Sequence, residues 1–206
     1  MSTWDMIRSE RASLTDALAT LPADAWDAPS LASEWTVRDV VAHMIATAQM
    51  TPPSFAGAMI GSGFNFQSMS AKKIAGVKAG RSDSDLVEIY RSLVDSRSAP
   101  PGPAPSWLGE TIVHGEDVFR SLGTYRAHPV EHIVAVADFY GGSNLLIGSK
   151  RRIDGVTLRA TDTGWSHGAG PEASGPAIAL LMAMTGRTAA LNDLSGPGVD
   201  VLRSRA

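Results

Sequence analysis

A glutamate and a histidine four residues apart, Glu110 and His114, are the pair in this sequence best suited to chemistry. In a helix this spacing turns the chain by roughly 400°, so both side chains project from one face. A carboxylate and an imidazole on one face can supply two ligands to a divalent metal, and Asp117 continues the same polar face. The alternative is a solvent-exposed pair that stabilises the helix by only a few tenths of a kcal/mol. Two ligands do not make a metal site, so a third donor must come from another element.

The third donor predicted here is His43, which lies on another amphipathic helix. The apolar stripe of that helix consists of Val37, Val40, Val41, Met44, Ile45 and Ala48. His43 lies roughly 130° from the centre of the stripe, on the border of the buried face. Facing helices of a bundle build metal sites from side chains that point inward. No local pattern connects His43 with the other two residues, and a surface histidine or a hydrogen-bonded core histidine is the alternative.

Other motifs carry less weight. Residues 164–168 match the Gly-x-Ser-x-Gly pattern, which in hydrolases places a serine on a strand–turn–helix elbow. The glycines and the proline of residues 168–171 cannot readily begin the required helix, so a serine hydrolase is not predicted. His167 lies in this glycine-rich turn and can approach a site from the C-terminal part of the chain. His128 and His132 are also four apart, but a proline follows His128, and we expect both at surface or capping positions.

The composition excludes several classes of function. The chain has 206 residues, of which 44% are hydrophobic and 19% charged, as in an ordinary globular protein. The net charge of -3 and the scattered cations argue against nucleic acid as a partner. The sequence has no cysteine, so any thiol chemistry must use a thiol from outside the chain. No apolar run approaches the roughly 18 residues of a membrane span and no signal peptide is evident, so we expect a cytoplasmic protein. We expect it to be a monomer or a homodimer.

Hydrophobic periodicity divides the chain into two parts and predicts an α+β fold. Residues 1–150 are expected to form an all-helical bundle, because their apolar residues recur at helical spacing. Residues 151–206 are expected to form a small α/β domain, because the alternation of Val156, Leu158 and Ala160 is typical of a strand.

Helix boundaries follow from caps and breakers. Thr36, with Asp39 three residues later, is a predicted N-cap, and the prolines at 52 and 53 should end that helix. The glycines at 57, 61 and 63 predict a mobile loop. Helices are further expected over about 3–21, 65–78, from Ser82 onward, 106–122, from Pro129 to about 141, and 177–184, with a second strand near Trp165.

Two stretches of the sequence resemble the mycothiol-dependent maleylpyruvate isomerase family, which belongs to the bacterial damage-inducible four-helix proteins. They are EWTVRDVVAH at residues 34–43 and ETIVHGED at residues 110–117. The resemblance continues at residues 164–165, 174–177 and 185–187, and so covers most of the chain. It implies that residues 1–150 form a metal-binding, up-down four-helix bundle. It also implies that His43, Glu110 and His114 are the metal ligands and that Arg187 is a catalytic arginine.

The resemblance implies a divalent metal, most simply zinc, and a low-molecular-weight thiol such as mycothiol. Two neutral histidines and one carboxylate leave a divalent cation positively charged, with an open position for a thiolate. The expected function is therefore an isomerisation or an S-transfer on a small electrophilic substrate, with Arg187 binding a substrate carboxylate and Asp117 orienting a ligand. The alternative is a non-catalytic metal- or ligand-binding stress-response protein on the same scaffold.

Overall fold

The computed structural model describes residues 1–32, 34–145 and 147–205. Contacts divide the chain into two compact units, Met1–Arg126 and Ala127–Ala206. The first unit contains helices only, and the second combines helices with a small sheet, which confirms the α+β class. The division falls before helix α7 (Val130–Gly142), whereas the sequence predicted it at residue 150. Helix α7 packs on α8 and α9 of the second unit, and its apolar periodicity could not indicate which partners it would meet.

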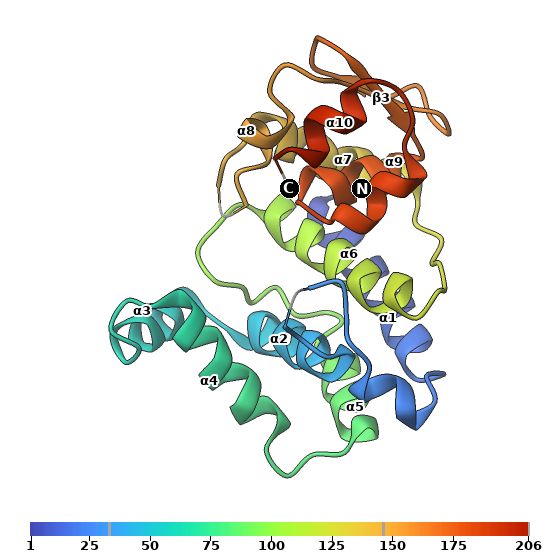
Figure 1. Cartoon of the computed structure of the whole chain (residues 1–206). Helices are drawn as coiled ribbons and strands as arrows, with labels where there is room; N and C mark the ends of the chain where they lie inside the picture. Colours follow the sequence, from blue (N-terminus) through green and yellow to red (C-terminus); the bar gives the residue numbers. More distant parts are fainter. Residues whose placement is uncertain (33, 146, 206) are drawn as a thin grey trace. The chain divides into compact units, whose positions relative to one another are not determined.

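The described residues of the first unit, 1–32 and 34–126, form seven helical segments. In chain order these are α1 (Thr3–Leu18), the 3₁₀ helix η1 (Ala23–Asp27), α2 (Val37–Gln49), α3 (Pro52–Ile60), α4 (Phe66–Lys78), α5 (Asp83–Ser92) and α6 (Ala104–Ser121). The apolar core is contributed by α1, α2, α5 and α6, which therefore form the predicted bundle. Helix α4 packs on α2, and α3 contacts α4 and extends to the left of the bundle helices in Figure 1.

Helix α2 positions most of the chemistry described below. The Thr36 side chain accepts a hydrogen bond from the Asp39 N–H, and the Asp39 carboxylate accepts one from the Thr36 N–H, which confirms the predicted N-cap. The helix ends at Gln49, before the two prolines. These prolines then occupy the first turn of α3, where a missing N–H costs nothing. The loop predicted over residues 57–63 is therefore wrong in its first half, because Thr51 caps a short helix that runs to Ile60.

The second unit is a small α/β arrangement. Its elements are α7, α8 (Ser149–Ile153), β1 (Thr157–Ala160), β2 (Ser166–His167), β3 (Glu172–Gly175), α9 (Ala177–Met184), the 3₁₀ helix η2 (Thr188–Asp193) and α10 (Gly198–Arg203). The strand order is β2-β1-β3, with β1 antiparallel to β2 and parallel to β3. Strand β3 was not predicted from the sequence. Helix α9 is apolar and almost wholly buried, as expected for a helix surrounded by other elements.

None of the helices in the described ranges is long and apolar enough to cross a membrane.

Candidate functional site

The three predicted metal ligands lie together in the first unit, between α2 and α6. The Nε2 atom of His43 is 3.9 Å from Oε1 of Glu110, and the imidazole rings of His43 and His114 meet edge to face with centroids 5.1 Å apart. Each of the three side chains is about 15% exposed, so solvent can reach them but does not surround them. The i,i+4 spacing on α6 and the position of His43 on α2 therefore bring these three side chains together.

Both histidines are oriented through their Nδ1 atoms. The Nδ1 of His114 lies 2.9 Å from Oδ2 of Asp117, which is completely buried one helical turn later. An ionised carboxylate can only accept, so this Nδ1 carries the proton and Nε2 keeps its lone pair. The Nδ1 of His43 lies 3.4 Å from the Ser70 hydroxyl on α4, which can fix the same tautomer. Metal-binding histidines are commonly held in this way, by a hydrogen bond to the nitrogen that does not bind the metal.

Burial changes the acid–base behaviour of the cluster. Desolvation by burial, followed by the electrostatic interaction with His114, lowers the pKa of His43 to about 3, so the imidazole of His43 is neutral at physiological pH. Desolvation also raises the pKa of Glu110 to about 7, although His114 and a hydrogen bond from Thr47 act in the opposite direction. The site therefore holds a neutral imidazole beside a carboxyl group that gains or loses its proton near neutrality.

Trp35 covers the two histidines. Its ring centroid is 4.7 Å from that of His43 and 6.1 Å from that of His114, with both pairs tilted. This tryptophan therefore packs directly on the candidate ligands. Ser70 gave no signal in the sequence, since only the three-dimensional crossing of α4 over α2 brings it to His43. Thr47 could have been found, because it lies four residues after His43 on the same side of α2.

No group of three or more His, Asp and Glu side chains within residues 1–32, 34–145 and 147–205 is arranged to hold a metal ion as it stands. The donor types nevertheless suit a divalent metal, because two neutral imidazoles and a carboxylate converge there. The 3.9 Å between His43 and Glu110 shows that their side chains would have to adjust to share an ion.

Other residues singled out by the sequence lie in the second unit. Strand β2 holds Ser166 and pairs with β1 as a short edge strand, with no helix directly after it, so the nucleophile-elbow geometry is absent there. His167 stacks on Trp165 and lies against the backbone of Gly141 in α7. Arg187 precedes η2, and its guanidinium donates to the carbonyl of Thr185.

The sequence profile described as the mycothiol maleylpyruvate isomerase N-terminal domain matches residues 7–134, more than half of the chain. The chain belongs to this family. The matched part of this family member contains His43, Glu110 and His114 and ends before Arg187. No curated protein matches the sequence.

Two crystal structures share the fold of this family member. Both are described as mycothiol-dependent maleylpyruvate isomerase, one of them a single-residue mutant. The TM-scores are 0.64 for the mutant and 0.63 for the other structure; in both cases the identity is 12%, and the alignment covers 95% of this chain and 91% of that chain. At this identity the likeness establishes the fold alone, including the second unit, of which the sequence profile reaches only residues 127–134.

Proposed function

We propose that the protein is a divalent-metal-dependent enzyme that uses a low-molecular-weight thiol such as mycothiol for an isomerisation or S-transfer on a small electrophilic substrate. The observation that carries this proposal is the convergence of His43, Glu110 and His114, with both histidines oriented through Nδ1. Membership of the isomerase family supports the thiol, because the family and both similar structures are named for mycothiol.

His43, Glu110 and His114 would hold the metal, for which zinc is the simplest choice given two imidazoles and one carboxylate. When bound, the metal would stabilise the thiolate form of an incoming thiol near neutral pH. Asp117 and Ser70 fix the directions of the two imidazoles, and Trp35 limits the access of water to them. The thiol must come from outside, because the chain has no cysteine.

The isomerisation proceeds by addition and elimination. The thiolate sulfur bonds to one carbon of a double bond conjugated to a carbonyl group, and the displaced electron pair moves to the carbonyl oxygen as an enolate. The former double bond is now single and rotates. The enolate then re-forms the double bond in the other geometry and expels the thiolate, so the thiol is regenerated. Arg187 is proposed to bind a carboxylate of the substrate, a task for which the planar guanidinium is well shaped.

The test combines metal content with activity. Elemental analysis and a mycothiol-dependent assay with maleylpyruvate are carried out on wild type, His43→Ala and His114→Ala, with His128→Ala as a histidine control outside the cluster. We expect near-stoichiometric divalent metal in wild type and in the control. We expect both cluster variants to lose the metal and to lose activity by more than about 100-fold, since removing an outer partner alone costs about 10–100-fold.

The assay is then repeated with Arg187→Lys, which keeps the charge and removes the planar fork. We expect metal content to be retained and KM for a dicarboxylate substrate to rise. Wild-type protein that binds no divalent metal after reconstitution would rule out the mechanism. Metal binding without thiol-dependent turnover of a substrate would favour the non-catalytic alternative.

A further inference from the structure

A pocket of the first unit lies on the side of α2 away from His43. Its volume is about 690 Å³, within the range of small-molecule sites, which runs to roughly 1,000 Å³. The lining residues come from α2, α3, α4, α5 and the connections after α3 and α4: Ile45, Gln49, Ala58, Gly61, Ser62, Met69, Lys72, Lys73, Gly76, Val77, Arg81 and Ile89. Ile45 and Gln49 lie roughly 200° and 240° around α2 from His43, so this pocket and the histidine cluster use opposite sides of one helix.

The pocket has an apolar floor and a cationic rim. Ile45 and Met69 are almost fully buried, and Val77 and Ile89 are partly buried beside them. The charged lining residues are Lys72, Lys73 and Arg81, and no aspartate or glutamate is among the lining residues. The sequence explains this imbalance, because residues 40–71 contain no Asp, Glu, Lys or Arg, and the first charges after them are the two lysines.

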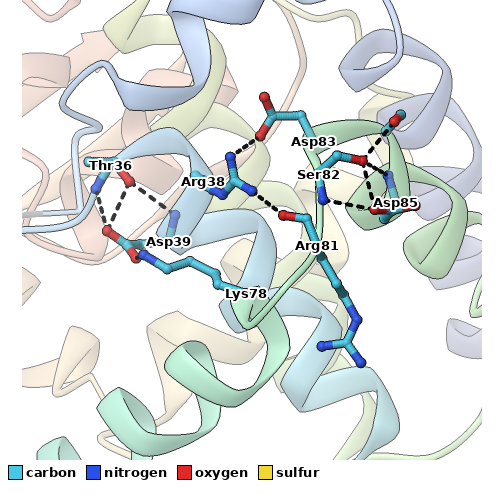
Figure 2. A network of polar contacts seen from close by, with 9 residues as sticks. Thr36, Arg38, Asp39, Lys78, Arg81, Ser82, Asp83 and Asp85 are labelled. Carbon is cyan, nitrogen blue, oxygen red and sulfur yellow. Dashed lines mark hydrogen bonds and ion pairs between the residues drawn. The ribbon is translucent and has the colours of Figure 1, made fainter.

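Two of the nearby carboxylates, Asp39 and Asp83, do not compensate this positive charge, because each is paired with a cation that does not line the pocket. Figure 2 shows Asp39 bonded to Lys78, and Asp83 bonded to Arg38, each at 2.6 Å. The same Arg38 donates to the backbone carbonyl of Arg81, which holds the α4–α5 connection against α2. The network therefore fixes one wall of the pocket and leaves the rim positive.

The two lysines have donor capacity for an anion. Lys73 is exposed and makes no hydrogen bond or ion pair with another residue of the described ranges. Lys72 donates to the carbonyl of Gly61 at 3.1 Å, which uses one of the three donors of its ammonium group. The edge next to them is apolar: α3 has no buried residue, and Ile60, Phe64 and Phe66 are 65%, 75% and 51% exposed.

We propose that this pocket binds an amphipathic organic anion, a carboxylate or phosphate carried on a hydrocarbon body. The anionic head is held by Lys72, Lys73 and Arg81, and the hydrocarbon lies on Ile45, Met69 and Val77. This site is independent of the proposed thiol chemistry, because it shares none of its residues.

The charge requirement is tested by isothermal titration with decanoate, with decanol and acetate as ligands that lack the charge or the hydrocarbon. We expect saturable binding of decanoate and at least about tenfold weaker binding of the other two. The double variant Lys72→Met, Lys73→Met keeps the apolar stems and should weaken decanoate binding about tenfold, because each exposed lysine contributes at most about 1 kcal/mol to an ion pair. The control is Lys150→Met, Arg151→Met, which removes the same charge from α8 and should leave decanoate affinity unchanged. Decanol binding as tightly as decanoate would overturn the anionic half of the proposal.

Two helical glycines supply a matched steric test. An added Cβ meets nothing within 4 Å at either Gly76 of α4 or Gly57 of α3, but only Gly76 lines the pocket. Gly76 lies on the face of α4 that carries Met69, Lys72 and Lys73, so a leucine there fills the space without disturbing the helix. We expect Gly76→Leu to weaken decanoate binding at least about tenfold and Gly57→Leu to leave it unchanged. Equal affinities in wild type and Gly76→Leu, with both variants folded by circular dichroism, would place any decanoate elsewhere and overturn the proposal.

The same variants distinguish a free ligand from a lipid. Sedimentation with phosphatidylglycerol vesicles is compared with phosphatidylcholine vesicles. Decanoate binding without vesicle binding identifies a free amphipathic anion as the ligand. Vesicle binding that requires phosphatidylglycerol and is lost in Gly76→Leu identifies an anionic lipid. Absence of saturable binding to decanoate and to both kinds of vesicle would overturn the inference. As a control for the histidine cluster, a His43→Ala protein should behave as wild type in all of these measurements.

Discussion

The two sides of helix α2 carry different chemistries. Toward α6, His43 meets a carboxyl group and a second imidazole in a mostly buried cluster whose members are held by hydrogen bonds. Toward α4, Ile45 and Gln49 meet a wider hollow with lysines at its rim and an exposed apolar edge. The first side is built from a few oriented donors, which suits one small ion. The second combines apolar surface with mobile charges, which suits a larger, less precisely placed ligand. One helix can thus serve two sites because its faces are set by residue spacing alone.

Asp117→Asn tests whether orientation matters on the His43 side. Asparagine keeps the shape but loses the charge that holds His114 in its tautomer, so we expect metal affinity or thiol-dependent activity to fall by about 10–100-fold. Affinity for decanoate should not change. The matched control is Asp138→Asn, because Asp138 also accepts a ring N–H, from Trp165 at 2.7 Å, but lies in the second unit. Equal losses in the two variants would show that the effect is one of general stability.

The pH dependence of stability reports on the burial of Glu110. In metal-free protein its pKa is raised to about 7, so the folded state favours the protonated form. The stability that this group contributes is complete below its unfolded pKa of about 4.3 and is lost as the pH rises through about 7. We expect the difference in unfolding free energy between Glu110→Gln and wild type to grow by about 3–4 kcal/mol over this range in favour of the variant. A difference that stays constant with pH, measured by urea denaturation after chelation, would mean that Glu110 is well solvated.

Part of both sides was predictable from the sequence. Local signals were sufficient for the Thr36 cap, for the shared face of Glu110 and His114, and for the border position of His43, because each depends on spacing within one helix. The pairing of His43 with Glu110 depends on how α2 meets α6, and only the family resemblance predicted it. No sequence pattern predicted the lysine-rimmed pocket, because its lining residues come from four helices. The loop predicted from the glycines at 57, 61 and 63 was wrong in its first half, because the prolines at 52 and 53 end one helix and also begin the next.

The second unit shows the same limit. Strand β1 alternates apolar and polar residues and was found, whereas β3, with the sequence Glu-Ala-Ser-Gly, has no large apolar residue to mark it. Its place in the sheet is set by pairing with β1, and Gly175 is required there because an added Cβ would lie 2.6 Å from the Asp193 carbonyl oxygen. Close backbone approach of this kind has no signature in a single sequence.

Thr36→Val tests the N-cap of α2, the helix that carries both sites. The substitution keeps the volume but removes the hydroxyl that caps the helix, and we expect a loss of about 1 kcal/mol in unfolding free energy. Metal content and decanoate affinity should both survive, because the cap sets where the helix begins and not which way its faces point. The control is Thr20→Val, which removes a hydroxyl that bonds only the Ala17 carbonyl at the surface and should change stability less. A selective loss at one site would mean that the cap also sets the local geometry of that side.

The smallest expected effect concerns the open glycines of the α3–α4 segment. Gly57 and Gly76 lie inside helices with ordinary backbone angles, and an added Cβ at either position would meet no atom. Alanine restricts the unfolded chain more than glycine does, so Gly57→Ala and Gly76→Ala should each stabilise the protein by about 0.5–1 kcal/mol. In the second unit, Gly168 has φ +81° and an added Cβ would lie 2.2 Å from the Val156 carbonyl oxygen, so Gly168→Ala should destabilise instead. Thermal unfolding of the three variants gives the sign of each change directly. If Gly76→Ala proved destabilising while Gly57→Ala did not, the pocket wall would be more tightly packed than an open binding site requires.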